Sequence, residues 1–352
     1  MSELSILAAP KSNFTQRTQR SKRKARKEED TKIGKALKCF VSSSLRALRL
    51  LLCVLCVKLL LGAARMLLKL FIPLIILFSL SLYANIPYTL TNEPIDVVIP
   101  TSAVDQETLS YCIEGVKKNC QNIRRIIVVS RQKMTNEAEW YDEADYPFSK
   151  YDVALYLKRM DPIGADRFMK SHNSRLGWYY QQLLKLYAPY VIPGISSNVL
   201  IVDSDTVFFR PTEFVNVEGG GNYAVSGEYN LPYFEHMARL LPTLRKVYHE
   251  YSGICHHMLF QKPILDDLFF QVESLHQQEF WKVFCLCVDP EYLREEGSGA
   301  SEYEIYFNFA FSTTDQVKIR PLHWTNSGDL NLMQNHIKDG YDFVSYHCYM
   351  RN

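Results

Sequence analysis

The chain has 352 residues, of which 47% are hydrophobic and 13% aromatic, enough for one large domain or two small ones. Its net charge of +2 conceals an asymmetry, because residues 1–50 hold 13 Lys and Arg against 4 Asp and Glu, whereas residues 86–352 hold 24 basic and 34 acidic residues. The two parts are therefore expected to face different surroundings. No phosphate-binding P-loop pattern is present, which argues against an ATPase.

Residues 1–45 form a polar, basic tail. The run RTQRSKRKARKEED contains almost no large apolar residue, which predicts disorder. Such a tail is typical either of a nucleic-acid or nuclear-import patch or of the positively charged cytosolic flank of a membrane anchor. The segments that follow favour the second interpretation, so no nucleic-acid partner is expected.

Residues 46–69 are apolar but are interrupted by Lys58, Arg65 and Lys69. At about 100° per residue these side chains fall on one narrow face of a helix. We therefore predict a basic amphipathic helix that lies on the anionic lipids of the cytosolic leaflet. A helical hairpin with two membrane spans is the alternative.

Residues 70–90 carry no charge over 21 residues, which predicts a transmembrane signal anchor. At about 1.5 Å per residue this run spans roughly 30 Å of hydrocarbon. Positive charge on its N-terminal side favours a single-pass type II protein with the C-terminal body outside the cytosol. We expect a Golgi or endoplasmic reticulum membrane, with residues 94–352 in the lumen.

The body after the anchor holds six cysteines, an even number that permits disulfides in an oxidising lumen. Cys285 and Cys287 alternate in an apolar run and fit a core position as well as a bridge. No C-x-x-C pair occurs in the body, which argues against a cysteine-rich zinc site.

The body opens with a strand, a helix and a second strand. PIDVVIPTS at 94–102 is an apolar strand, ETLSYCIEGVKKNC at 107–120 has helical spacing, and IRRIIVVS at 123–130 is another apolar strand. Such a unit predicts an α/β fold with a mostly parallel sheet flanked by helices. GWYYQQLLKLYAP predicts a helix that Pro189 stops, and SNVLIVD at 197–203 predicts a third buried strand.

Asp203 and Asp205 follow this third strand in the stretch SNVLIVDSDTVFFRP. Ligands of open parallel sheets bind beyond the carboxyl ends of the strands. Two side chains at i and i+2 share one face of an extended chain, where two carboxylates would repel each other. A Mn²⁺ or Mg²⁺ ion, which prefers oxygen ligands and bridges phosphates, removes that conflict. Two turn-forming aspartates are the alternative.

Residues 94–352 resemble the GT-A glycosyltransferases, the nucleotide-diphospho-sugar transferase superfamily with a Rossmann-like sheet. The D-x-D stretch, GWYYQQLLKLYAP, SGICHHMLF and SEYEIYFNFA occur in the order found in a poorly characterised family of predicted glycosyltransferases of this fold. The resemblance implies a GT-A domain preceded by one transmembrane helix. It also implies a metal-dependent transfer of a sugar from a nucleotide-sugar donor to a glycan, glycoprotein or lipid acceptor.

The resemblance also implies roles for individual residues. Asp203, Asp205 and His347 would bind the metal, and Thr101, Lys185, Asp203 and Arg351 would bind the nucleotide. Trp178, Gln181, His256 and His257 would line the substrate site. Glu302 and Glu304 in SEYEIYFNF would act on the acceptor, Glu302 as general base or orienting carboxylate. They share one face if this segment is a strand and diverge if it is a helix.

Two other functions stay open at this point. A membrane-anchored binding protein that kept a transferase fold without turnover is one alternative, which Mn²⁺-stimulated hydrolysis of a nucleotide sugar would separate from an enzyme. A nucleotidyltransferase of similar sheet topology is the other, although the glycine-rich N-terminal signature of such enzymes is not found. The sequence names neither the sugar nor the stereochemistry of the reaction.

Overall fold

The computed structural model describes residue 52 and residues 88–172, 174–293 and 297–350. Residues 87–352 form one compact unit. Within the described residues, no helix has the length and apolarity needed to span a bilayer. The predicted tail, amphipathic helix and signal anchor lie outside the described residues, apart from residues 52 and 88–90.

A five-stranded sheet forms the centre of this unit, with the strand order β3-β2-β1-β4-β7. Strands β1 (Ile95–Pro100), β2 (Ile123–Ser130), β3 (Glu139–Asp142) and β4 (Asn198–Val202) run parallel, and β7 (His257–Gln261) pairs antiparallel with β4. The predicted mostly parallel α/β sheet is therefore confirmed. The order places a topological switch point between β1 and β4, where the chain departs in opposite directions along the sheet.

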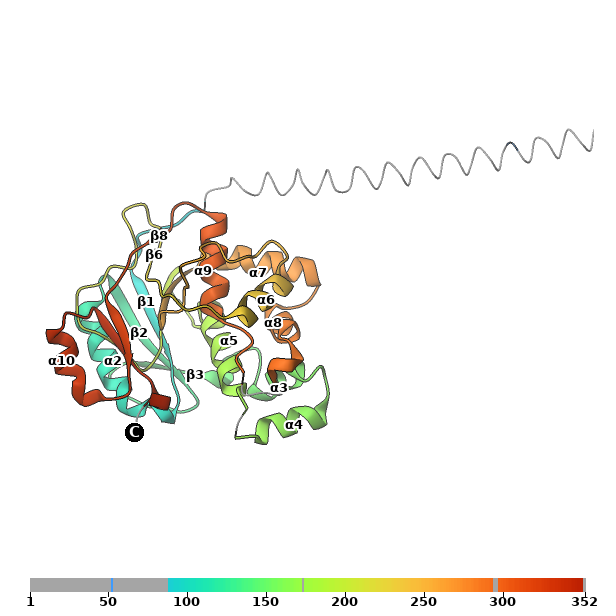
Figure 1. The fold of residues 1–352 in the computed structure, drawn as a ribbon, viewed down its shortest axis with the longest axis horizontal. Coiled ribbons are helices and arrows are strands. Elements are labelled where there is room, and N and C mark those ends of the chain that lie inside the picture. The colour runs from blue at the N-terminus through green and yellow to red at the C-terminus, as the bar shows by residue number, and fades with distance from the viewer. Residues whose placement is uncertain (1–51, 53–87, 173, 294–296, 351–352) are drawn as a thin grey trace, which may run out of the picture. The chain divides into compact units, whose positions relative to one another are not determined.

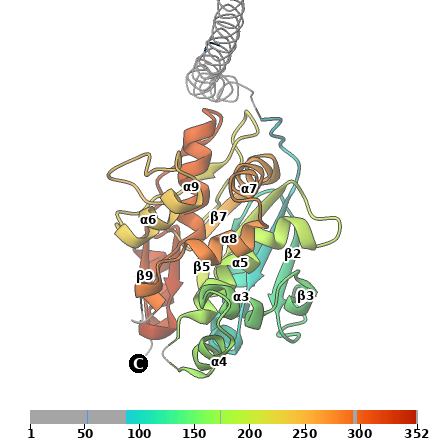
Figure 2. The same ribbon diagram turned by 90° about the vertical axis from the view of Figure 1, so that its right-hand side faces the viewer.

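Helices cover both faces of this sheet because its central strands are mostly apolar. Every residue of β1 and of β4 is buried. Helix α2 (Gln106–Asn119) covers one face, while α5 (Leu176–Val191), α7 (Lys262–His276) and α9 (Glu302–Thr313) lie on the other side (Figure 1). Figure 2 looks at that second side and shows α5 and α7 in front of the sheet.

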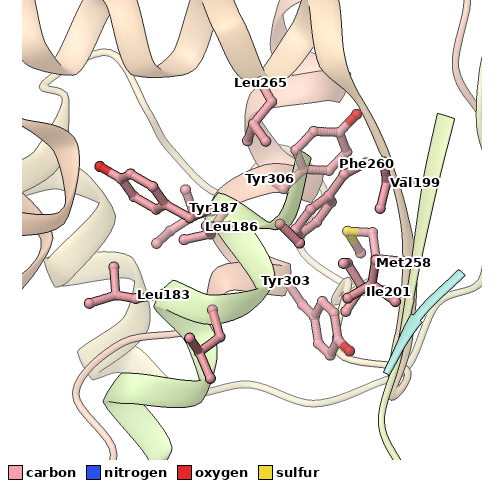
Figure 3. Close-up of a cluster of buried hydrophobic side chains, with 14 of the residues drawn as sticks. Leu183, Leu186, Tyr187, Val199, Ile201, Met258, Phe260, Leu265, Tyr303 and Tyr306 are labelled. Atoms are coloured by element: carbon pink, nitrogen blue, oxygen red, sulfur yellow. The ribbon is translucent and has the colours of Figure 1, made fainter. Parts of the chain in front are cut away.

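The core between α5 and the sheet is built from every second residue of β4 and β7. Val199 and Ile201 of β4 lie opposite Phe260 and Met258 of β7, so these side chains share the face that α5 covers. Figure 3 shows them packed with Leu183, Leu186 and Tyr187 of α5, Leu265 of α7, and Tyr303 and Tyr306 of α9. This packing fixes α5 and α9 against the carboxyl half of the sheet.

A second, three-stranded sheet brings the C-terminal segment to the end of β4. Its order is β5-β10-β9, from β5 (Thr206–Phe208), β10 (Phe343–Tyr346) and β9 (Trp324–Ser327). The backbone N–H of Tyr346 donates to the carbonyl of Asp205 over 2.8 Å. His347, the next residue, is thereby placed beside the two aspartates from a distance of about 140 residues along the chain.

The remaining elements complete the layers around these two sheets. They are the helices α3 (Lys150–Leu157), α4 (Pro162–Lys170), α6 (Leu231–Leu240), α8 (Phe280–Cys287) and α10 (Met333–Lys338), and the short parallel pair β6 (Asn222–Tyr223) and β8 (Lys318–Ile319).

Two details differ from or refine the sequence expectations. Pro189 does not stop α5, so this part of the prediction is wrong: the helix continues to Val191, because a proline in the last turn removes only one helical hydrogen bond. Of the six cysteines of the body, all are free thiols, five are buried, and only Cys348 is exposed. Cys285 and Cys287 are core residues.

The contact between α2 and β5 yields a stability prediction. A Cβ on Gly115 of α2 would lie 2.9 Å from the backbone nitrogen and 3.0 Å from the backbone oxygen of Phe208, and neither atom can move aside freely. We expect Gly115→Ala to lower the free energy of unfolding by about 1–3 kcal/mol. Gly177→Ala in α5 is the matched control, because its new Cβ would have only Lys150 Nζ at 4.0 Å.

Chemical denaturation measures both variants. Gly177→Ala should be neutral or stabilise by about 0.4–1 kcal/mol, since alanine loses less chain entropy than glycine in a helix. Equal effects at the two positions would contradict the close packing of α2 on β5.

Candidate active site

A pocket of about 540 Å³ opens beyond the carboxyl end of β4, beside the switch point of the sheet. Its walls come from the segment after β1, the N-terminal half of α5, the turn after β4, the segment before α6, the start of α9 and the C-terminal segment. Most of the sequence-predicted site residues line it: Trp178, Gln181, Lys185, Asp203, Asp205, His256, Glu302 and His347.

Asp203 and Asp205 occupy a turn rather than an extended strand end. The backbone N–H of Thr206 donates to the carbonyl of Asp203 over 2.9 Å, which closes the turn. We expected an extended chain to place the two carboxylates on one face. That reason is wrong, because the two residues lie in a turn. The turn still directs both side chains into the pocket, where each contacts a different partner.

Lys185 links Asp203 to the start of α9. Its Nζ lies 2.6 Å from Asp203 Oδ1 and 2.6 Å from Glu302 Oε1, and only 4% of the lysine is exposed. Burial lowers the pKa of Lys185, but the two carboxylates outweigh burial and raise that pKa above its usual value. The Tyr303 hydroxyl also donates to Asp203 Oδ1 over 3.0 Å. Asp203 is thus committed to protein partners.

Electrostatics keep Asp203 ionised within this cluster. Burial raises the pKa of its carboxyl, yet Lys185 and then His256 outweigh burial and hold that pKa well below the usual range. For Glu302 burial dominates over Lys185, so its pKa is raised. The buried Glu302 and the partly buried Asp203 share one ammonium group.

Asp205 and His347 form a second pair. His347 Nδ1 lies 3.0 Å from Asp205 Oδ2, and both residues are about 8% exposed. The second polar atom of each side chain, Asp205 Oδ1 and His347 Nε2, is buried without a hydrogen-bond partner among the described residues. A buried polar atom without a partner is costly, and a carboxylate oxygen and an imidazole nitrogen are both metal-ligating atoms.

His256 joins the two pairs. Its backbone adopts a left-handed conformation with φ 59°, which is uncommon for a residue with a side chain and is often found at functional sites. Its Nδ1 lies 3.5 Å from Asp203 Oδ2, and its ring centroid lies 4.5 Å from that of His347. The sequence analysis placed His256 in the substrate site, and the structure places it in the pocket beside Asp203.

Glu302 and Glu304 diverge because the segment is a helix. Ser301 caps α9, and Glu302 enters the pocket with 2% of its surface exposed. Glu304 does not line the pocket. Its carboxylate accepts hydrogen bonds from Ser252 Oγ at 2.5 Å and from Asn308 Nδ2 at 2.7 Å. Burial raises the pKa of Glu304.

Two further predicted residues, Thr101 and His257, do not line the pocket. Thr101 is buried behind Ser102, whose carbonyl accepts from the Thr101 hydroxyl over 3.4 Å. The ring of His257 packs in the core against Phe208 and Phe343, and burial lowers its pKa to about 3. His257 is therefore a core residue and does not line the substrate pocket. Arg351 lies outside the described residues.

The sequence analysis missed several residues that line the pocket. They lie in loops, at the starts of helices or in the short strand β9, where no motif marks them: Asp105, Arg175, Glu228, Asn230, Tyr233, Ser298, Asn326 and Tyr349. Asp105 takes the place expected for Thr101 after β1 and accepts from Ser204 Oγ over 3.3 Å. With these residues included, the described pocket wall holds five acidic side chains and two basic ones.

The charged cluster is enclosed by aromatic and backbone groups of α5 and α9. Trp178 is half-buried, and its Nε1–H donates to the carbonyl of Ala300 over 3.3 Å. Arg175 lies over the Trp178 ring, 5.4 Å from its centroid. This combination of a half-exposed indole, fixed carboxylates and a histidine pair can bind a polar, sugar-like ligand.

The sequence model of a family of unknown function (DUF6492) matches residues 82–339, which is well over half of the chain. The chain belongs to the DUF6492 family. The match spans both aspartates, Lys185, His256 and Glu302, and ends before His347. No curated protein matches the chain in sequence.

Solved structures similar to this DUF6492 chain include three with a low identity. Mouse xyloside xylosyltransferase 1 in its apo form has 10% identity and a TM-score of 0.32, over 74% of this chain and 99% of that one. An active-site mutant of LgtC has 11% identity and a TM-score of 0.34, over 71% of this chain and 86% of that one. The WbbM bifunctional glycosyltransferase has 11% identity and a TM-score of 0.32, over 73% of this chain and 46% of that one. At these TM-scores and identities, no inference about the fold, substrates or residue roles of this chain follows from the similarities.

The buried charge cluster yields a stability prediction that is independent of any activity. Lys185→Met leaves the buried Glu302 and the partly buried Asp203 without their common cation, and we expect a loss of about 3–5 kcal/mol in the free energy of unfolding. Lys262→Met is the matched control, because Lys262 pairs with Asp266 at the surface and such pairs contribute about 0–1 kcal/mol.

Chemical denaturation of both variants measures the difference. Adding Glu302→Gln to Lys185→Met should recover part of the loss, since one buried carboxylate is removed. A Lys185→Met variant as stable as Lys262→Met would show that the cluster is not the buried ion group described.

Proposed function

We propose that this protein is a divalent-metal-dependent glycosyltransferase that transfers a sugar from a nucleotide-sugar donor to a hydroxyl acceptor. The observation that carries the proposal is the Asp205–His347 pair, in which Asp205 Oδ1 and His347 Nε2 are both buried without a partner among the described residues. Both residues line a pocket at the carboxyl end of β4, where nucleotides bind in open parallel sheets.

The charge of the pocket supports the need for a cation. Five acidic and two basic side chains line it among the described residues, so an anionic diphosphate would be repelled by the protein alone. In the part of the chain that the structure describes, no three His, Cys, Asp or Glu side chains are arranged to hold a metal together. Two protein ligands are enough for Mg²⁺ or Mn²⁺ when phosphate oxygens and water complete the shell.

Asp205 and His347 are the residues that would hold the metal. When bound, such a cation neutralises phosphate charge and stabilises a departing nucleoside diphosphate. Lys185, Tyr303 and His256 keep Asp203 in a fixed position at the wall of the site. Trp178 offers a half-exposed face on which a sugar or a base can stack, and Gln181 offers hydrogen bonds next to it.

The experiment that tests this function combines nucleotide binding and turnover. A panel of nucleotide sugars is screened with Mn²⁺ for thermal stabilisation of the protein and for release of nucleoside diphosphate. A donor that stabilises and is consumed only with Mn²⁺ supports the proposal. Binding without turnover would favour a binding protein of transferase fold.

The metal residues yield the next prediction. Asp205→Asn and His347→Ala should each weaken Mn²⁺-dependent binding of a nucleoside diphosphate at least about tenfold, because each removes one donor atom. Isothermal titration with and without chelator measures the change. Asp266→Asn is the control, since Asp266 lies on α7 and outside the pocket. Affinity that neither variant changes, or that chelator leaves intact, would refute the metal site.

The place of the reaction is also part of the proposal. The basic tail, the uncharged run at 70–90 and the acidic body support a type II protein of the Golgi or endoplasmic reticulum membrane, with residues 94–352 in the lumen. In intact microsomes the body should resist protease until detergent is added. Digestion without detergent would contradict this topology.

A further inference from the structure

In an inverting transfer to a hydroxyl, a side chain of the pocket must take the acceptor proton. His256 is paired with Asp203 and His347 is a proposed metal ligand, so the base is sought among the carboxylates. Among the described residues five carboxylates line the pocket: Asp105, Asp203, Asp205, Glu228 and Glu302. Their contacts decide which of them can serve.

Glu302 and the two aspartates of the turn are already engaged. Glu302 is 2% exposed, and its Oε1 contacts Lys185 Nζ at 2.6 Å. Asp203 binds the same ammonium group and the Tyr303 hydroxyl. Proton uptake by either would break a buried ion pair. Asp205 is the proposed metal ligand, and it is paired with His347.

Asp105 is also occupied, although less tightly. Its Oδ2 accepts from Ser204 Oγ over 3.3 Å. Asp105 precedes α2 directly and lies on the β1 side of the turn, where the nucleotide rather than the acceptor is expected. It is therefore a poor candidate for contact with the acceptor.

Glu228 differs from these four. It is exposed to solvent, and its carboxylate has no hydrogen bond or ion pair with any described residue. Partial burial raises the pKa of its carboxyl, and His256 and His347 partly offset that rise. The observations that single out Glu228 are that it lines the same pocket as these two histidines and that its carboxylate is unpaired among the described residues.

The backbone around Glu228 is held in place while its side chain stays free. Ser226 pairs with Ser252 through two backbone hydrogen bonds of 3.0 Å, and the Glu228 N–H donates to Ser226 Oγ over 3.2 Å. Two residues later Asn230 leads into α6 (Leu231–Leu240), and the Tyr233 N–H donates to the Asn230 carbonyl over 3.1 Å. A short segment fixed at both ends positions Glu228 at the pocket.

We propose that Glu228, rather than Glu302, is the general base of the transfer, an inference that rests on the proposed function. The acceptor oxygen forms a bond to the anomeric carbon while the bond from that carbon to the diphosphate oxygen breaks. The electron pair of the broken bond leaves on the nucleoside diphosphate. The hydroxyl proton moves to the Glu228 carboxylate.

The test compares the wild-type chain with Glu228→Gln, Glu228→Ala and Glu250→Gln. Glu250 is the matched control, because it lies two residues before Ser252 on the paired segment, is exposed, and does not line the pocket. The probes are Mn²⁺ with UDP or GDP for binding, and the nucleotide-sugar panel for turnover. Formate is added to the alanine variant as a substitute carboxylate.

We expect Glu228→Gln to lower kcat by about 10²–10⁴, with the affinity for nucleoside diphosphate and Mn²⁺ unchanged. Formate should restore part of the turnover of Glu228→Ala, which a merely structural role would not allow. Glu250→Gln should match the wild type. Normal kcat in Glu228→Gln, or a loss that formate does not relieve, would overturn the assignment.

Two other results have separate meanings. A fall in Mn²⁺-dependent nucleotide affinity in Glu228→Gln would identify Glu228 as a ligand of the metal or nucleotide, and would overturn its role as base. Absence of donor turnover in the wild-type protein would instead refute the proposed function, and the reaction assigned to Glu228 with it.

Discussion

The buried contact of Lys185 with Asp203 and Glu302 is the interaction on which the site depends. It joins α5, the turn after β4 and the start of α9, and the lysine lies 117 residues from Glu302 along the chain. Three charged groups out of water are stable only when each is paired with good geometry. The lysine thus fixes Asp203 and α9 relative to each other, and the pocket wall follows from that arrangement.

The same helix that supplies the lysine also holds the segment leading into α9. Trp178 Nε1 donates to the Ala300 carbonyl, the Tyr179 hydroxyl accepts from the Gly299 N–H, and Gln182 Oε1 accepts from the Glu302 N–H. These side chains recur at helical spacing, so one side of α5 satisfies backbone groups that a buried loop would otherwise leave unpaired. The motif GWYYQQLLK therefore has a structural role that is independent of any substrate.

The sequence predicted those parts of the fold whose signal is local. Predominantly apolar runs marked β1, β2 and β4. The acidic pair at the end of β4 marked the pocket, because ligand sites in parallel sheets lie at that edge. The assignment of Glu302 and Glu304 depended on whether their segment is a strand or a helix. Its aromatic composition fits both, and only packing against α5 decides it.

Other features depend on long-range contacts that no local pattern reports. Glu228 lies between a glycine and a tyrosine in an irregular segment, and only the backbone pairing of Ser226 with Ser252 brings it to the pocket. His257 stands next to His256 in the sequence, yet the left-handed backbone of His256 sends one ring into the pocket and leaves the other in the core. Sequence reasoning could name both histidines but could not separate their roles.

The distribution of charge in the pocket connects these observations with the proposed chemistry. Of its two basic side chains, Lys185 forms ion pairs with Asp203 and Glu302. The other, Arg175, lies at the start of α5 over the ring of Trp178. Little positive charge from the described residues is left for a diphosphate. Under the proposed function the cation would therefore bind before or together with the nucleotide, since a wall of five acidic and two basic side chains attracts cations and repels anions. In that proposal the protein fixes the carboxylates, and the metal would supply the charge that makes an anionic donor acceptable.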